Sequence, residues 1–288
     1  MTLPITRRAA GRAPLAAALL ACSALSAFTV AAFASPALAA DPALTLPTVN
    51  VTGQKAGGGT LTVPSPAAAK EQILQIPGGV AVVGSEQWRD SQATTLKDAL
   101  DYTPGVFVQP KWGEDARLSI RGSGLARNFH LRGVTLLQNG MPLNAADGSG
   151  DFQELDPTAY RYVEVYKGAN GQRYGANSLG GAINFVTQTG RDAAPLEGRL
   201  DVGSYGFKRV QASTGGALEK VDGFLTGSWQ QQNGFRDHSY GQSNRAAGNV
   251  GVKLTDNAET RFFVNLAEID QKIPGSVSKT VALNAPKT

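Results

Sequence analysis

Residues 245–254 read Arg-Ala-Ala-Gly-Asn-Val-Gly-Val-Lys-Leu, and their pattern recurs through the second half of the chain. Small or apolar residues occupy every second position, and Arg245, Asn249 and Lys253 lie between them. An alternation with a period of two predicts a β-strand with one apolar and one polar face. A tilted strand of about this length matches the hydrocarbon thickness of a bilayer.

Four further strands of the same kind are expected, starting near Leu196, Val210, Val221 and Phe262. The connections alternate in length, with short turns expected at 215–220 and 256–258 and a long polar loop at 231–243. A soluble β-sandwich would also alternate. However, the many charges on the polar face, together with the loop lengths, favour a wet lumen and a lipid-facing exterior.

We therefore expect residues 196–288 to form the first strands of an antiparallel transmembrane β-barrel. Five strands cannot close such a barrel, and an open edge in lipid leaves unpaired backbone groups. The barrel is accordingly expected to be truncated, either because the chain is a fragment or because the reading frame is shortened.

Residues 76–188 predict a small α+β domain ahead of the barrel. Its glycine content and turn signals favour β structure, since the chain holds 34 glycines in 288 residues. Strands are expected at 80–83, 118–120, 134–137, 141–143, 162–166 and 182–187, and a short amphipathic helix at 91–102. Asn139-Gly140 is a strong signal for a type I′ hairpin turn.

The first 39 residues have the layout of a secretory signal peptide. Three arginines precede a long apolar stretch that ends in Ala37-Leu38-Ala39, a small-residue cleavage site. A membrane anchor is the alternative, but no charged stop-transfer flank follows. Cleavage after Ala39 would remove the single cysteine and lower the formal net charge from +4 to about +1. We therefore infer no nucleic-acid partner from the basic pI.

Residues 40–75 are expected to form a tether rich in Pro, Ala, Gly and Thr. A short extended patch within it, Pro47-Thr48-Val49-Asn50-Val51-Thr52, could add itself as a strand to the sheet edge of a partner. An ordinary disordered linker is the other interpretation that composition alone leaves open.

The middle domain resembles the plug of the TonB-dependent outer-membrane receptors. The resemblance covers about residues 76–187 and extends loosely into the barrel. It rests on the following pieces, in this order: Leu96-Lys97-Asp98-Ala99-Leu100, Thr103-Pro104-Gly105-Val106, Ile120-Arg121-Gly122, the hairpin at 136–143, Val163-Glu164-Val165-Tyr166-Lys167-Gly168, Arg173-Tyr174-Gly175, and Leu179-Gly180-Gly181-Ala182-Ile183-Asn184.

The resemblance implies a mechanism. A barrel of about 22 strands encloses the plug, and a scarce ligand, usually a ferric siderophore or another metal chelate, binds outside. The patch at 47–52 then looks like the TonB box, with which TonB pairs as an added strand, driven by its inner-membrane energising complex. The expected location is the outer membrane of a Gram-negative bacterium, in contact with its lipid.

The resemblance also implies roles for single residues. Arg121 and Lys167 match basic plug positions that face barrel carboxylates and lock the plug to the wall. Lys167 departs from the more frequent arginine, and Ala169 from the more frequent proline, which puts the second contact in doubt. The carboxylate partners are expected beyond Thr288. Trp112, Arg127 and Phe129 are expected near the plug apices, where aromatic and guanidinium groups suit an anionic ferric chelate.

No residue pattern predicts catalysis. His130 and His238 are far apart in sequence, and no nucleophile and base share a local signature. Asp147 begins an acidic turn, but Thr158 stands where a calcium loop needs glutamate, so we expect no resident metal or cofactor. The competing interpretations are a plugged channel, adhesin or phage receptor without TonB coupling, a non-functional truncated receptor, and a secreted β-sandwich enzyme or lectin.

Overall fold

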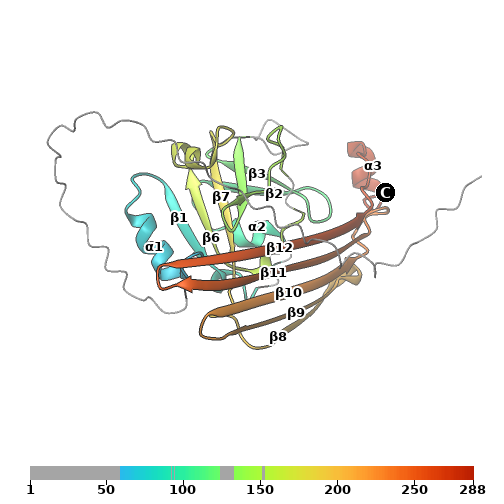
Figure 1. The fold of residues 1–288 in the computed structure, drawn as a ribbon. Coiled ribbons are helices and arrows are strands. Elements are labelled where there is room, and N and C mark those ends of the chain that lie inside the picture. The colour runs from blue at the N-terminus through green and yellow to red at the C-terminus, as the bar shows by residue number, and fades with distance from the viewer. Residues whose placement is uncertain (1–58, 92, 94, 124–132, 151–152) are drawn as a thin grey trace, which may run out of the picture. The chain divides into compact units, whose positions relative to one another are not determined.

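The computed structural model describes residues 59–91, 93, 95–123, 133–150 and 153–288. The expected signal peptide, the patch at 47–52 and the candidate residues Arg127 and Phe129 lie outside these ranges. The described chain forms two parts, a mixed N-terminal domain and a sheet of five long strands that we call the wall sheet (Figure 1).

The N-terminal domain is built on a five-stranded sheet with the order β1-β6-β7-β4-β5, in which only the β4 and β7 pair is parallel. Its strands are β1 (Val80–Gly84), β4 (Val134–Gln138), β5 (Met141–Pro142), β6 (Tyr160–Lys167) and β7 (Gly181–Thr187). The strands β2 (Val106–Pro110) and β3 (Ala116–Ile120) form a separate hairpin. Every residue of β4 and β7 is buried, because the sheet is covered on two faces.

The helices of this domain are shorter and differently placed than the sequence predicts. The expected helix at 91–102 is only α2 (Leu96–Leu100), because Thr95 is its N-cap and Asp98 bonds back to the Thr95 N–H in a capping box. A second helix, α1 (Pro66–Leu74), lies in what we expected to be tether. Ser65 caps it, and the buried Ala69 packs it against Tyr162 and Val186.

Short 3₁₀ turns complete the connections. They are η1 (Ser85–Gln87), η2 (Pro157–Ala159), η3 (Gly168–Tyr174) and η4 (Ser204–Gly206). Beyond the wall sheet the chain forms the small helix α3 (Lys279–Asn284), capped by Ser278.

The hairpin predicted at Asn139-Gly140 is confirmed. Both residues have positive φ, 51° and 80°, as a type I′ turn requires. The Asn139 carboxamide oxygen also accepts hydrogen bonds from the Thr187 N–H and hydroxyl, at 2.9 and 3.0 Å. The turn is therefore tied to the end of β7 as well as to its own strands.

The wall sheet is antiparallel throughout, with its strands in chain order. They are β8 (Glu197–Val202), β9 (Lys208–Ala217), β10 (Val221–Gln232), β11 (Gly241–Thr255) and β12 (Ala258–Gln271). The last three are longer than the nine or ten residues expected, because pairing continues past the apolar positions into polar ends such as 241–245. The connections alternate as predicted, short at 218–220 and 256–257 and long at 233–240.

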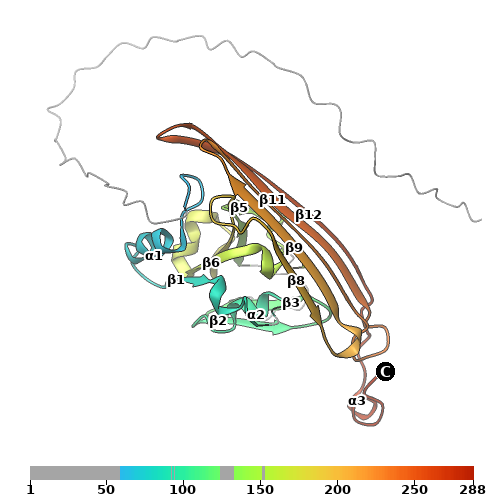
Figure 2. The same ribbon diagram turned by 90° about the horizontal axis from the view of Figure 1, so that it is seen from below.

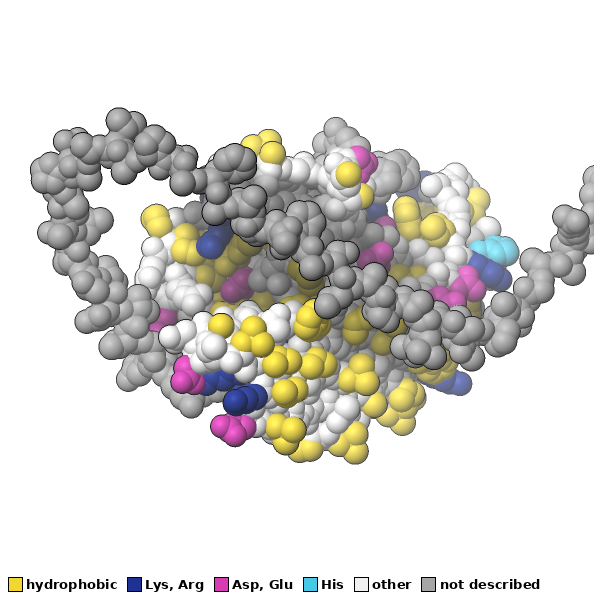
Figure 3. Space-filling model, in the orientation of Figure 1, with side chains coloured by type: hydrophobic (Ala, Val, Ile, Leu, Met, Phe, Trp, Pro, Cys, Tyr) yellow, Lys and Arg dark blue, Asp and Glu magenta, His cyan; other side chains and the backbone are white. Residues whose placement is uncertain are grey.

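One face of the wall sheet is exposed and apolar. Large exposed side chains on this face include Leu200, Val210, Leu225, Val250, Phe262, Val264 and Leu266. Figure 3 shows hydrophobic side chains gathered over the region where the wall sheet lies in Figure 1. The alternation predicted from sequence is thus confirmed, with the apolar set pointing away from the N-terminal domain.

Within the described ranges, no helix combines the length and the apolar composition needed to cross a membrane.

The opposite, polar face of the wall sheet is turned toward the N-terminal domain. The sheet curves along one side of that domain in both ribbon views (Figures 1 and 2). The fold class expected from sequence is therefore confirmed: an α+β domain followed by barrel-type antiparallel strands that do not close on themselves.

Candidate functional site

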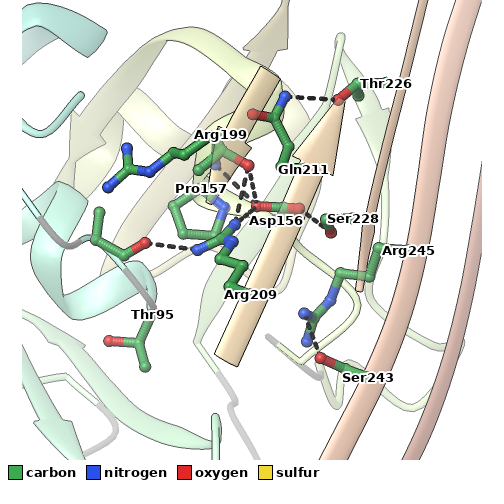
Figure 4. Close-up of polar contacts among 12 residues, drawn as sticks. Thr95, Asp156, Pro157, Arg199, Arg209, Gln211, Thr226, Ser228, Ser243 and Arg245 are labelled. Carbon is green, nitrogen blue, oxygen red and sulfur yellow. Dashed lines mark hydrogen bonds and ion pairs between the residues drawn. The ribbon is translucent and has the colours of Figure 1, made fainter. Parts of the chain in front are cut away.

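The two parts meet through buried polar side chains, one of which is Arg209 on β9. This residue is 1% exposed, and its guanidinium lies between two loops of the N-terminal domain (Figure 4). It donates to Asp156 Oδ1 at 2.5 Å, to Thr158 Oγ1 at 2.9 Å and to the Ala93 carbonyl at 2.7 Å. Ser228 on β10 donates to the other oxygen of Asp156. Two wall strands thus hold one carboxylate of the N-terminal domain.

Asp156 is ionised in this arrangement. Burial raises the pKa of the carboxyl, but the Arg209 guanidinium and the hydrogen bonds from Ser228 and Thr158 outweigh burial and leave the pKa below its usual value. Local structure also prepares the carboxylate, because Asp156 caps η2 by accepting from the Thr158 N–H at 2.9 Å.

A second ion pair, again with the arginine on the wall sheet, is formed by Arg245 on β11. Arg245 pairs with Glu114, which lies in the β2–β3 loop, and donates to the Gln153 carbonyl at 2.8 Å through Nε. Ser243 lies beside it, donating to Glu114 Oε1 at 2.7 Å and accepting from Arg245 Nη1 at 2.9 Å. In both contacts the wall supplies the arginine and the N-terminal domain supplies the acid.

Hydrogen bonds to uncharged acceptors extend the interface along the sheet. Arg199 on β8 donates to the carbonyls of Arg89 and Ser91 at 2.6 and 2.7 Å. Gln138 on β4 donates to Asn265 on β12 at 2.8 Å. A cavity of about 330 Å³ with a mixed polar and apolar lining remains between these contacts, lined by Glu154, Tyr160, Thr226, Arg245 and Asn265 among others. The interface therefore combines discrete hydrogen-bonded points with one apolar contact, in which Phe263 of β12 packs against a cluster that includes Tyr162 and Val186.

The structure brings Arg121 and Lys167 together, as two neighbouring cations. Arg121 has a φ of 52°, and its N–H donates to the Gly105 carbonyl at 2.8 Å. A Cβ built on Gly105 would lie 3.8 Å from Arg121 Cγ and 3.9 Å from Lys167 Cδ, so both side chains pass over this glycine. Partial burial, and then the charge of Arg121, lower the pKa of Lys167.

Neither cation has an ion-pair partner in the described part of the chain. Two adjacent cations, one of them with a depressed pKa, make a site at which an anion would be stabilising. The lock predicted for Arg121 and Lys167 stays a prediction, because no carboxylate of the wall sheet reaches either side chain.

Of the three residues predicted at the plug apices, only Trp112 is described. It lies half-buried in the β2–β3 loop, with the Lys111 ammonium 5.1 Å from its ring centroid. Glu114, which contacts Arg245, is two residues further along the same loop. Trp112 is therefore close in sequence to a wall contact, and its role in ligand binding stays a prediction.

Sequence reasoning missed the contacts of Arg209 and Arg245. Arg245 was correctly placed on the polar face of its strand, but nothing in the sequence paired Arg209 with Asp156 or Arg245 with Glu114. A usable signal was present: an arginine alternating with lipid-facing residues in a barrel strand points into the lumen, where it needs an acid.

The described residues hold no group of three or more His, Cys, Asp or Glu side chains that could bind a metal ion. Asp147 instead accepts from the N–H and hydroxyl of Ser149, at 2.9 and 2.6 Å, and so stabilises its own turn.

The arrangement defines a class: a small α+β domain held by ion pairs against the polar side of an antiparallel sheet whose other side is apolar. A family model described as "TonB-dependent Receptor Plug Domain" matches residues 72–182. Residues 72–182 are therefore similar to the plug domain of the TonB-dependent receptors, and the wall sheet follows them in the chain. We now call residues 59–189 the plug domain.

Curated relatives agree at the level of the family. The chain is 24% identical to the vitamin B12 transporter BtuB of Vibrio vulnificus over 65% of this chain and 34% of that relative. It is 26% identical to the ferripyoverdine receptor of Pseudomonas aeruginosa, over 71% of this chain and 26% of that one. The chain thus spans about a third or less of these relatives.

Solved structures show the same fold. The siderophore receptor PirA from Acinetobacter baumannii superposes with a TM-score of 0.53 at 19% identity, over 69% of this chain and 32% of that structure. The ferric yersiniabactin uptake receptor FyuA from Yersinia pestis gives a TM-score of 0.54 at 20% identity, over 66% and 31%.

Proposed function

We propose that this chain is the plug and first wall strands of a TonB-dependent outer-membrane receptor that takes up a scarce ligand, most simply a ferric siderophore or another metal chelate. The observation that carries the proposal is the seating of the plug domain. Buried ion pairs at Asp156–Arg209 and Glu114–Arg245 join it to the polar face of a sheet whose other face is apolar.

This seating suits a gate rather than a catalyst. Apolar packing between plug and wall would hold the plug permanently, whereas separate polar contacts can be broken and remade in water. The cavity of about 330 Å³ between the contacts provides space for that water. In this proposal the chain is not an enzyme, needs no resident cofactor, and uses TonB with its inner-membrane complex to supply the energy.

The test uses the complete receptor in a strain that lacks its own copy. Residues 47–52, the proposed TonB box, are deleted in one variant, and residues 53–58 in a matched variant of the same tether length. Deletion of 47–52 should abolish uptake of a labelled ferric chelate and leave binding to whole cells intact. Deletion of 53–58 should retain most of the uptake.

Equal uptake by both deletion variants would instead support the competing function, a TonB-independent plugged channel, adhesin or phage receptor. Both variants must be found in the outer-membrane fraction for the comparison to count. Labelled cobalamin belongs in the same assay, because a vitamin B12 transporter is among the relatives.

A further inference from the structure

The most highly connected side chain of the wall sheet is Arg261, near the start of β12. Its side chain is fully buried, and it donates to four residues. Nη1 and Nη2 contact the two oxygens of Asp222 on β10 at 2.9 and 2.8 Å, and Nη1 contacts Asn249 Oδ1 on β11 at 2.6 Å. Nη2 also contacts Glu259 at 2.8 Å, and Nε contacts the Thr62 hydroxyl at 3.0 Å.

A glycine in the middle of the sheet allows this reach. Asp222 is paired with Gly251, and Gly251 with Arg261, so the three residues form one row across β10, β11 and β12. A Cβ on Gly251 would overlap the guanidinium. The arginine can therefore cross β11 only because position 251 has no side chain.

The fourth partner, Thr62, belongs to the segment that precedes α1. Its hydroxyl donates to Glu259 Oε1 at 2.6 Å while accepting from Arg261, and the Leu61 N–H donates to Glu259 Oε2 at 2.9 Å. Leu61 is 59% exposed. The next residue, Val63, is buried in an apolar cluster that includes Phe263 of β12, so the polar contacts hold residues 61–62 on the wall beside an apolar contact at Val63.

Two of the partners of Arg261, Asn249 and Asp222, also contact the end of the plug domain. Asn249 donates to the Gln188 carbonyl at 2.8 Å, and Asp222 accepts from the Gly190 N–H at 3.0 Å. The N-terminal entry and the C-terminal exit of the plug domain are thus bound to one small area of wall, beside the short turn at 256–257. The long loop at 233–240 lies at the other end of the strands.

We propose that Glu259 and Arg261 form a releasable docking site for the tether, which we call the tether dock. The dock holds residues 61–62 against the wall and so keeps α1 and the edge strand β1 in place. A pull on the tether must detach residues 61–62 before it reaches the plug sheet. Only this last step rests on the proposed function, since docking itself requires no partner.

Thr62→Val tests the docking step, because it removes the hydroxyl and keeps the branched shape. Hydrogen exchange of the complete receptor, purified without TonB and read by mass spectrometry, should show amides 59–63 exchanging at least about tenfold faster in Thr62→Val and in Glu259→Gln. Peptides from β6 and β7 should be unchanged. Lys253→Gln is the control, since it removes an exposed ion pair with Asp256 near the same turn.

Unchanged exchange at 59–63 in both variants would overturn the docking site. So would exchange in the wild-type receptor as fast as in a free peptide of the same sequence. Neither result depends on uptake, so this test can fail while the proposed function stands.

The release step has its own test. Thr62→Cys and Glu259→Cys are combined in the complete receptor and joined in the outer membrane by a short bis-maleimide. If release is required, cross-linked receptor should lose uptake to the level of the 47–52 deletion, and each single cysteine variant treated in the same way should keep it. Normal uptake by fully cross-linked receptor would overturn the release step.

Discussion

Arg209 and Asp156 are 53 residues apart in the sequence, yet Arg209 Nη2 lies 2.5 Å from Asp156 Oδ1 and both side chains are buried. The pair joins β9 of the wall to the loop before β6 of the plug domain. A buried charge pair of this kind contributes little compared with an apolar pair, but breaking it on one side is costly. The relationship therefore makes the seating of the plug sensitive to single substitutions.

Arg209→Ala should destabilise the plug-to-wall contact by about 3–5 kcal/mol, because it leaves the Asp156 carboxylate buried without its cation. Denaturant unfolding of the purified complete receptor, followed by hydrogen exchange at 153–160, measures the effect. Lys208→Ala is the matched control, since Lys208 is exposed on the same strand, and it should change stability by less than about 0.5 kcal/mol. A loss equal to that of the control would show that the pair does not hold the plug.

The same contact should weaken in acid. The pKa of Asp156 is lower in the folded protein than its usual value of about 4. Its stabilising contribution is therefore complete above pH 4 and is lost as the pH falls through the folded value. Exchange at 153–160 should accelerate in that acid range in wild type, and Asp156→Asn should remove this component. A wild-type profile that matches Asp156→Asn would contradict the assignment.

Arg121→Ala should increase passive entry of large solutes through the complete receptor, if Arg121 and Lys167 face wall carboxylates as the family resemblance implies. Sensitivity of whole cells to a large antibiotic normally excluded by the outer membrane provides the measurement. Lys70→Ala serves as control, because Lys70 is exposed on α1. No change in sensitivity would count against the lock.

Two substitutions at Asn139 separate the contributions of its hydrogen bonds and of its positive φ to the stability of the hairpin. Asn139→Gly keeps the positive φ and removes the hydrogen bonds from Thr187, so it should cost about 1–3 kcal/mol. Asn139→Ala should cost about 1–2 kcal/mol more, because alanine is also strained at that φ. Equal stability of the two variants in denaturant unfolding would mean that backbone conformation is unimportant at this turn.

Trp112→Ala should weaken binding of the ferric chelate to whole cells if the β2–β3 loop contacts ligand. Phe107→Ala is a useful comparison, since Phe107 is an exposed aromatic on β2 outside the loop. Equal affinities of Trp112→Ala and wild type would remove Trp112 from the candidate ligand residues.

Local sequence patterns predicted turns and strand faces correctly where the residues have a strong preference for one backbone conformation. Asn139-Gly140 marks a turn because both residues tolerate positive φ. Ala246, Val250 and Leu254 mark the apolar side of β11 because side chains on a strand alternate. Helix α1 was missed although its start carries local signals, with Ser65 as N-cap, Pro66 in the first turn and alanines after it, and it also packs against Tyr162 and Val186.

The sequence alone predicted the fold class of this protein: an α+β domain followed by barrel-type strands with one apolar and one polar face. These features depend on composition, period and turn chemistry, which act over a few residues. The folded structure alone shows that Arg209 pairs with Asp156 and Arg245 with Glu114. It also shows that Arg121 and Lys167 are neighbours and that Thr62 forms hydrogen bonds with Glu259 and Arg261. Such pairings join residues between about 50 and 200 positions apart in the sequence. The attraction between two charges depends on their distance in space, which is set only when the chain has folded.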